Sequence, residues 1–126
     1  MSQELPVLAR TFPANADFTG KRYHIVKLLT TGRVDIAGAN EDSIGVLQKD
    51  EASAQDVPSS VSMLGTIKVK ADGSVTPIVI GDRLKSNASG IAVKGGAGAD
   101  KNLLRALEAS SAANDIIEAF FERIVT

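Results

Sequence analysis

The sequence predicts a small, mainly β domain, either a barrel or a sandwich, and three observations lead to this fold class. Short apolar runs with strand-like alternation follow one another at close spacing, separated by Gly, Asp and Asn. No long helical segment lies between these runs before residue 100, so the strand–helix alternation of a parallel α/β sheet is missing. The length of 126 residues fits one domain that buries a core of its own.

The composition excludes several classes of function. Apolar residues make up 44% and charged residues 23%, as in an ordinary globular protein, and the net charge of −1 gives no field that would collect nucleic acid. The chain has no cysteine, which excludes disulfides and thiol catalysis. No apolar run approaches a membrane span, and the N-terminus lacks the layout of a signal peptide. We therefore expect a protein made in the cytoplasm, with no membrane and no direct nucleic-acid partner.

Residues 1–20, "MSQELPVLARTFPANADFTG", differ from the rest of the chain. Two prolines favour extended backbone for the residues that precede them. The segment is also richer in apolar residues than a disordered tail. We predict an extended arm over 1–20 that docks on its own domain, on a sister subunit or on another protein, followed by a single β-rich domain over 21–126. The candidate contact residues of this arm are Leu5, Pro6, Val7, Leu8, Phe12 and Pro13.

Four strands are predicted in the first half of the domain: 23–29, 33–38, 43–49 and 61–71. The last is the clearest, because its polar side chains lie on one face and Leu64 is the exception. The opposite face of this strand, which we expect to lie on a core, carries Val61, Met63, Gly65, Ile67, Val69 and Ala71.

The next segments are predicted as short strands joined by turns. Asp72-Gly73 indicates a hairpin turn into a strand over 74–80, in which Pro77 marks an edge or a bulge. Gly81-Asp82 then turns into "RLKS" (83–86), and residues 87–90 turn again into "IAVK" (91–94).

The C-terminal third fits two structures. Apolar spacing favours a helix over the last segment, with Asn114 or Asp115 as its N-cap, so a short helix is one alternative. The other is a strand, in which Ile117, Ala119 and Phe121 share one face and 110–115 form a hairpin loop. An apolar pattern on both faces would suit a strand between a core and a subunit interface. The candidate interface residues are Ile116, Phe120 and Phe121.

The segment "GIAVKGGAGADK" (90–101) has the general layout of a phosphate-binding loop but not its chemistry. The lysine and hydroxyl that would follow the second glycine of a P-loop are missing, and the dinucleotide pattern lacks its third glycine. We interpret Gly95–Gly98 as a flexible connector. The alternative is a small ligand-binding β module, for a sugar or a nucleotide, that uses this loop. His24 is the only histidine, and no catalytic, metal-binding or cofactor-binding set of residues is identified.

The order of these features resembles the capsid cement, or head decoration, proteins of tailed bacteriophages. The segment "FPANADFTGKRYHIVKL" (12–28) is similar to the family's opening, an arm that leads into a glycine and the first strand. The segments 43–71 and 79–95 are similar to its long glycine-containing strand and its Gly-Asp corner with a hairpin. Residues 104–121 are similar to its closing strand pair, although the family usually has glycine at the position of Asn114 and often near Arg105.

This resemblance implies a small β-tulip-like barrel, a homotrimer, on the outer surface of the virion. Proteins of this family bind the major capsid protein of the expanded icosahedral shell and stabilise it against internal DNA pressure. The resemblance also implies that the C-terminal pair is β, and it carries over no catalytic residue and no cofactor. The expected function is therefore that of a structural, non-enzymatic protein of the phage head.

Overall fold

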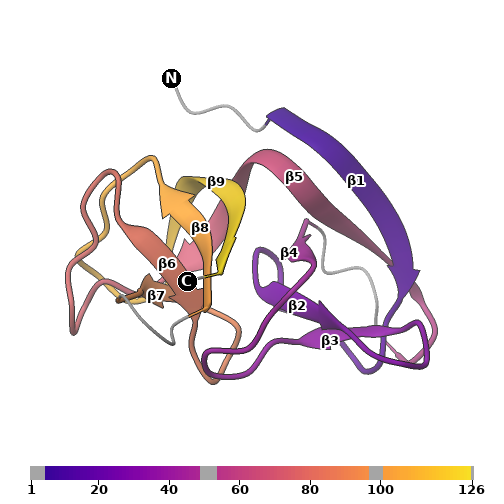
Figure 1. The fold of residues 1–126 in the computed structure, drawn as a ribbon. Helices are drawn as coiled ribbons and strands as arrows, with labels where there is room; N and C mark the ends of the chain where they lie inside the picture. Colours follow the sequence, from indigo (N-terminus) through magenta and orange to yellow (C-terminus); the bar gives the residue numbers. More distant parts are fainter. Residues whose placement is uncertain (1–4, 49–53, 97–100, 126) are drawn as a thin grey trace.

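The computed structural model describes residues 5–48, 54–96 and 101–125, and these residues form strands, turns and loops without a helix (Figure 1). The fold is therefore mainly β, as the sequence predicts. The strands are β1 (Leu5–Pro13), β2 (Ile25–Leu28), β3 (Val34–Ile36), β4 (Gly45–Leu47), β5 (Pro58–Ala71), β6 (Arg83–Ser86), β7 (Ala92–Lys94), β8 (Lys101–Ala106) and β9 (Asp115–Val125).

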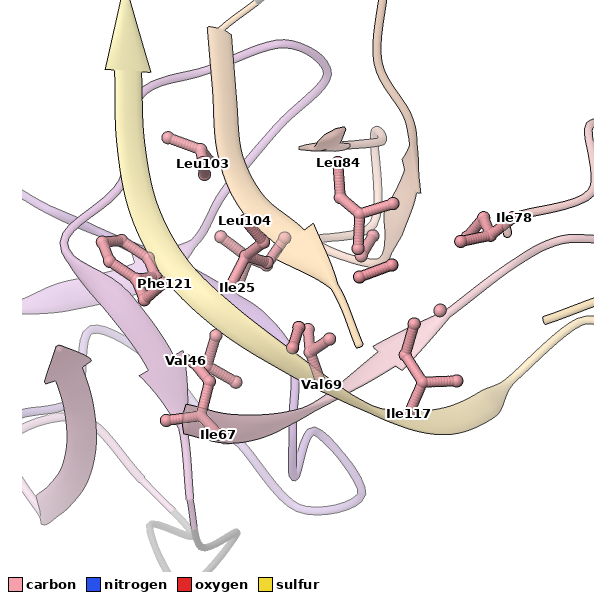
Figure 2. Packing of buried hydrophobic residues seen from close by; sticks show 14 of the residues in the cluster. Ile25, Val46, Ile67, Val69, Ile78, Leu84, Leu103, Leu104, Ile117 and Phe121 are labelled. Carbon is pink, nitrogen blue, oxygen red and sulfur yellow. The ribbon is translucent and has the colours of Figure 1, made fainter. Parts of the chain in front are cut away.

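Five of these strands close into a barrel. Hydrogen-bonded neighbours run in the order β5-β7-β6-β8-β9, and β9 pairs again with β5, so the ring has no open edge. The second half of β5 contributes this wall, with Gly65 opposite Phe121 and Ala71 opposite Asp115. Large aliphatic side chains and one phenylalanine fill the interior, where each contributes about 1.5–3 kcal/mol relative to exposure. Figure 2 shows Ile67, Val69, Leu84, Leu103, Leu104, Ile117 and Phe121 among them.

The other strands form a sheet on the first half of β5. Hydrogen-bonded neighbours in this sheet run in the order β3-β2-β4-β5-β1. Its two outer ends, β3 and the residue after β1, meet at a bridge between Val34 and Ala14. Side chains from these strands and from the segment after β1 form a second apolar cluster. The buried members of this cluster are Phe12, Ala14, Phe18, Val26, Val34, Leu47 and Val61.

The short strands β2 and β4 lie between the two cores. Ile25 and Val46 belong to the cluster of the barrel, whereas their neighbours Val26 and Leu47 belong to the second cluster. Because successive side chains of a strand point to opposite faces, both faces of these strands are buried. This explains why the runs "IV" and "VL" lack polar alternation.

Strand β5 joins the two halves and bends at Gly65. This glycine has φ +100, and the pairing of β1 with β5 shifts register on the opposite strand between Pro6 and Ala9. A positive φ inside a strand suits glycine, which has no Cβ to clash. Gly65 therefore lies where β5 passes from the β1–β4 sheet into the barrel.

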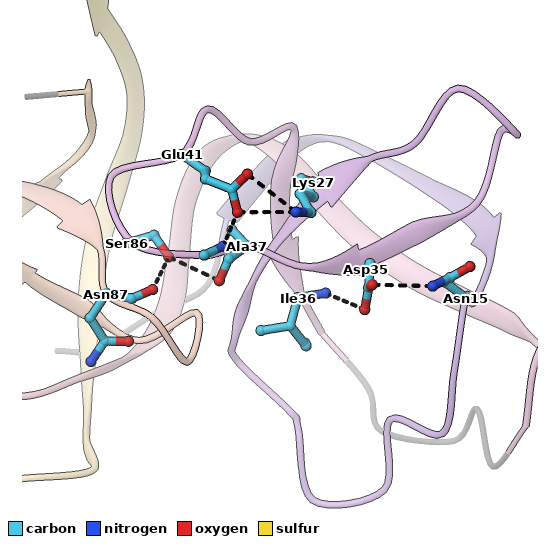
Figure 3. Close-up of polar contacts among 9 residues, drawn as sticks. Asn15, Lys27, Asp35, Ile36, Ala37, Glu41, Ser86 and Asn87 are labelled. Carbon is cyan, nitrogen blue, oxygen red and sulfur yellow. Dashed lines mark hydrogen bonds and ion pairs between the residues drawn. The ribbon is translucent and has the colours of Figure 1, made fainter.

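A set of polar contacts also joins the two halves. The Ile25 amide donates to the Gly90 carbonyl at 2.7 Å, and the Asn40 amide donates to the Ser86 carbonyl at 2.9 Å. The Ser86 hydroxyl donates to the Ala37 carbonyl at 3.4 Å (Figure 3). Since Ser86 and Gly90 flank the β6–β7 turn, this turn docks on the β2–β3 region.

The two C-terminal segments are strands, so the alternative of a helix there is wrong for this chain. Ile117 and Ala119 are buried and Ile116 is exposed, which is the period of a strand. The barrel explains the outcome, because β9 supplies hydrogen-bond partners to both β5 and β8. Asn114 ends the preceding loop with φ +61, a conformation that asparagine tolerates.

The predicted hairpin at Asp72-Gly73 and the strand over 74–80 are wrong. Residues 74–80 form a loop with one isolated bridge, between Ile78 and Ser110. The Asp72 carboxylate accepts hydrogen bonds from the amide and the hydroxyl of Ser74, which favours a local turn. The β5 residues that a hairpin would pair are already occupied, because this end of β5 pairs with β9 and β7.

Candidate interaction surface

The described residues contain a polar hollow of about 380 Å³ beside β2, in which Lys27 and Glu41 form an ion pair. The Lys27 ammonium lies 3.0 and 3.2 Å from the two carboxylate oxygens of Glu41 (Figure 3). The Gly38 amide donates to the same carboxylate at 2.6 Å. The lining residues are Lys27, Leu28, Asn40, Glu41, Asp42, Ser43 and Ile44. Lys27 and Glu41 therefore partly neutralise each other, and the Asp42 carboxylate accepts the Ser43 amide at 2.9 Å.

No group of three or more His, Asp or Glu side chains that could hold a metal ion occurs among the described residues. His24 is buried, and its Nδ1 donates to the Ser89 carbonyl at 2.8 Å. Burial lowers the pKa of His24 below its usual value, and the positive charges of Lys70 and Lys21 lower it further. The bond to Ser89 places His24 at the contact between the two halves. Across residues 5–48, 54–96 and 101–125, no helix could span a membrane.

The candidate residues of the arm all lie on β1. This strand runs antiparallel to β5, from Leu5 opposite Thr66 to Pro13 opposite Pro58. Phe12 is buried in the second cluster and Pro13 is exposed. The positions of Leu5, Pro6, Val7 and Leu8 are known here from the backbone alone. In the described residues β1 has a strand partner on one side only, so its other edge is available for pairing.

The three candidate interface residues of β9 point to two different sides. Phe121 lies in the barrel core with 4% of its surface exposed. Ile116 and Phe120 are 44% and 40% exposed and lie on the outer face, opposite Lys70 and Thr66 of β5. This outer face therefore offers Ile116 and Phe120, but not Phe121, to another molecule.

The Gly95–Gly98 segment lies only partly within the described residues, which resume at residue 101 after residue 96. The Gly95 amide donates to the Arg83 carbonyl at 2.8 Å, so the start of the segment is attached to β6. Residues 97 and 98 lie outside the described residues. The role of this segment as a connector or as a ligand loop therefore stays a prediction.

The most apolar exposed surface was not identified from the sequence. It lies on the loop that leads into β6, at the opposite end of the molecule from β3 (Figure 1). Val75, Val79 and Ile80 are 89%, 55% and 69% exposed on this loop. We name residues 74–81 the apolar loop. The signal in the sequence was the run "PIVIG", in which adjacent large aliphatic residues leave no polar face for a half-buried strand.

Hydrogen bonds hold the apolar loop against the barrel. Ile78 is buried, and its amide and carbonyl both bond to Ser110, each at 2.9 Å. The Gly81 amide donates to the Ala106 carbonyl at 2.8 Å, and the Val79 amide donates to the Asp82 carboxylate at 2.9 Å. The exposed side chains are therefore presented by an anchored backbone.

Two arginines lie beside the apolar loop on neighbouring strands. Arg83 of β6 is directly opposite Arg105 of β8. The Arg105 guanidinium donates to the Gly81 carbonyl at 3.1 Å, which connects this pair to the loop.

Comparison with known proteins gives the fold. The chain is similar to the head fiber gp8.5 N base of bacteriophage phi29, with a TM-score of 0.71 and 18% sequence identity. The match covers 94% of this chain and 100% of that crystal structure. No family model matches the chain, and neither does any curated protein. At this identity the likeness establishes a shared fold: the barrel and its attached sheet are an arrangement also used by a phage head fiber base.

Proposed function

We propose that the protein is a structural component of a tailed-phage head that binds the outer surface of the expanded capsid and stabilises it against internal DNA pressure. The observation that carries this proposal is the fold shared with the head fiber base of phage phi29 over the whole of that structure. The resemblance of the sequence to capsid cement proteins supports the same role. The partners in this proposal are the major capsid protein and further copies of the chain, as a homotrimer.

The surface chemistry supports binding rather than catalysis. The described residues offer exposed apolar side chains on the apolar loop and on β9, and a β1 strand with an unpaired edge. An unpaired edge binds an extended segment through main-chain hydrogen bonds, without a pocket. Three copies on a symmetry axis would multiply weak contacts through avidity. In this proposal residues 1–20 reach the shell or a neighbouring subunit, and Ile116 and Phe120 contact another copy.

The test is reconstitution on heads that lack the protein. Purified protein is added to expanded and to unexpanded heads of the phage that carries the gene, and both samples are imaged by electron cryomicroscopy. We expect density for three copies at fixed positions on expanded heads, and decorated heads that keep their DNA to a higher temperature. Protein that binds neither kind of head would overturn the proposal. Decoration without any gain in DNA retention would limit the role to decoration.

A further inference from the structure

We propose that the groove along the first half of β5, which β1 fills in the single chain, also joins copies of the protein: β1 of one copy fills this groove in the next. The partner is therefore a second copy of the chain, and the exchanged segment is residues 5–18. This inference rests on the homotrimer of the proposed function and specifies the contact that would hold it together.

The fit between β1 and this groove is the first reason. β1 pairs with β5 along its whole length (Figure 1), from Leu5 opposite Thr66 to Pro13 opposite Pro58. Phe12 at the end of β1 is 9% exposed and lies in the second cluster. Every copy carries the same strand, so β1 of a neighbour would make the same hydrogen bonds and bury the same side chains. Exchange of an identical element therefore keeps the contacts of the single chain.

The irregular register of this pairing makes the groove specific for β1. The register skips Val7 on β1 and Met63 on β5, both close to the positive-φ residue Gly65. Such an extra residue bends a strand and increases its twist. A regular extended segment lacks these irregularities, so it does not follow the bend of β5 with the same pairing. The groove therefore favours β1 of another copy over a strand of an unrelated protein.

The turn that follows the exchanged segment is the second reason. Phe18 is buried, whereas residues 19–22 are exposed. The Lys21 amide donates to the Phe18 carbonyl at 2.9 Å, and Gly20 has φ +77 within this turn. A Cβ added to Gly20 would meet no atom within 4 Å, so the space beside it is open. This turn can straighten into a link between two copies at the cost of one short-range hydrogen bond.

The other hydrogen bonds that hold the end of the exchanged segment can re-form in the next copy. The Ala14 amide donates to the Val57 carbonyl at 3.0 Å. The Asn15 amide donates to the Val34 carbonyl at 2.9 Å, and its side chain donates to Asp35 at 3.1 Å. These partners all follow the turn in the sequence, so a neighbouring chain supplies them as well as the same chain does. The exchange therefore gives up little that the single chain has.

The free edge of β1 is the other place where an extended segment could add. Proline has no amide to donate, and Pro6 and Pro13 stand near the two ends of β1. Pairing at this edge is therefore limited to the residues between the two prolines. The groove on β5 accommodates the whole strand, so exchange is the contact that we infer.

The test uses disulfides between β1 and β5, since the chain has no cysteine of its own. Thr11 and Ser60 are directly opposite in the pairing, and neither is buried. Full-length T11C and S60C, one of them tagged, are refolded together and oxidised, in solution over a range of concentrations and on expanded heads. Exchange brings the two cysteines of different chains together, and mass spectrometry identifies the disulfide that joins them. The control mixes K68C with E118C, which are opposite on β5 and β9 within the closed barrel.

We expect T11C and S60C chains to become linked to each other, and K68C and E118C chains to stay separate. G20A should raise the linked fraction about five- to thirtyfold at concentrations where the chain with Gly20 is mostly unexchanged, because alanine opposes the positive φ of the closed turn. G32A is the matched control, since Gly32 also has positive φ in open space but lies in the β2–β3 turn. Without any cysteine, G20A should form oligomers at lower concentration than the wild type in analytical ultracentrifugation.

The possible results separate the two proposals. If a T11C/S60C double variant forms its disulfide only within single chains, both in solution and on heads, exchange is wrong; head binding would then leave the proposed function standing. Linked chains in solution together with no binding to any head would keep exchange and overturn the proposed function. Equal oligomer formation by G20A, G32A and the wild type would also contradict exchange. Thermal unfolding of each variant checks that the fold is retained.

Discussion

The two halves of this protein enclose their cores in different ways. The barrel closes through continuous pairing of β9 with both β8 and β5. The β1–β4 sheet closes only at the bridge between Ala14 and Val34, and its last member, β1, comes from the N-terminal segment. One half is therefore a closed ring that can hold its loops in fixed positions. The other half is completed by β1, a strand that the same chain could instead pair with a neighbouring molecule.

The largest effect is expected from removing the segment that completes the β1–β4 sheet. A chain without residues 1–18 loses β1 together with the buried Phe12, Ala14 and Phe18. We expect it to lose more stability than the roughly 3–5 kcal/mol of one Phe-to-Ala core change. A chain without residues 1–4 is the control. Denaturant unfolding measures both, and a shortened chain as stable as the control would show that residues 1–18 are an independent arm.

A matched pair of core truncations should separate the two halves. F18A removes a ring from the second cluster and is expected to cost about 3–5 kcal/mol, and L84A in the barrel about 2–5 kcal/mol. Hydrogen exchange distinguishes the two variants. F18A should reduce the protection of β2–β4 amides while those of β8 and β9 remain protected. Equal loss of protection in both halves would mean that β5 couples them into a single cooperative unit.

A smaller effect is expected where the two halves touch. Gly90 has φ +74, and a Cβ added there would lie 2.5 Å from Ile36 Cγ2 and 2.9 Å from the Ile25 carbonyl oxygen. G90A should therefore lose about 1–3 kcal/mol from overpacking in addition to the backbone strain. G32A is the matched control, because Gly32 also has positive φ but faces open space. If thermal unfolding gives the same loss for both, the close approach at Gly90 carries no energetic weight.

The smallest effect is a dependence of stability on pH. Burial lowers the pKa of His24 in the folded protein below the value of 6.5 that it has when unfolded. The unfolded chain therefore binds the proton more readily, and stability falls as pH drops below about 6.5, by at most about 1.4 kcal/mol per pH unit. Three carboxyl groups also have lowered pKa values in the folded protein: Asp17, Asp56 and Asp72. Their protonation affects stability only below about pH 3.8. Urea unfolding between about pH 5 and 8 measures the slope, which H24Q should remove; an unchanged slope in H24Q would contradict the assignment.

Some elements of the fold could be predicted from local pattern alone. The face of β5 that carries Val61, Ile67 and Val69 is buried as its alternation predicts, and "RLKS" forms β6 at the predicted bounds. In these segments one side packs on a core, so burial follows the period of the strand. Ser62 is the exception: it lies on the predicted polar face but is 1% exposed, because β1 and β4 pair with β5 on both sides of it. Asn114 likewise adopts the turn conformation that its residue type permits.

Other elements could not be predicted, because partners distant in sequence decide them. The segment over 115–125 has apolar spacing that suits a helix, yet pairing with β5 and β8 makes it a strand. The segment over 74–80 has strand-forming residues, yet the end of β5 has no free edge for it. Because residues 74–80 cannot pair with β5, the aliphatic side chains of the apolar loop that are not buried in the core stay on the surface.

By itself, the sequence determined the mainly β class, the positions of most strands and the lack of the usual catalytic and phosphate-binding motifs, since each depends on residue type and short-range spacing. Tertiary structure decided the closure of the barrel, the second core behind β2 and β4, and the exposure of Val75, Val79 and Ile80. The physical reason is that the backbone N–H and C=O groups of a strand find their hydrogen-bond partners on another strand. The choice of that neighbour, made across the whole chain, settles which side chains are buried and which remain available for binding.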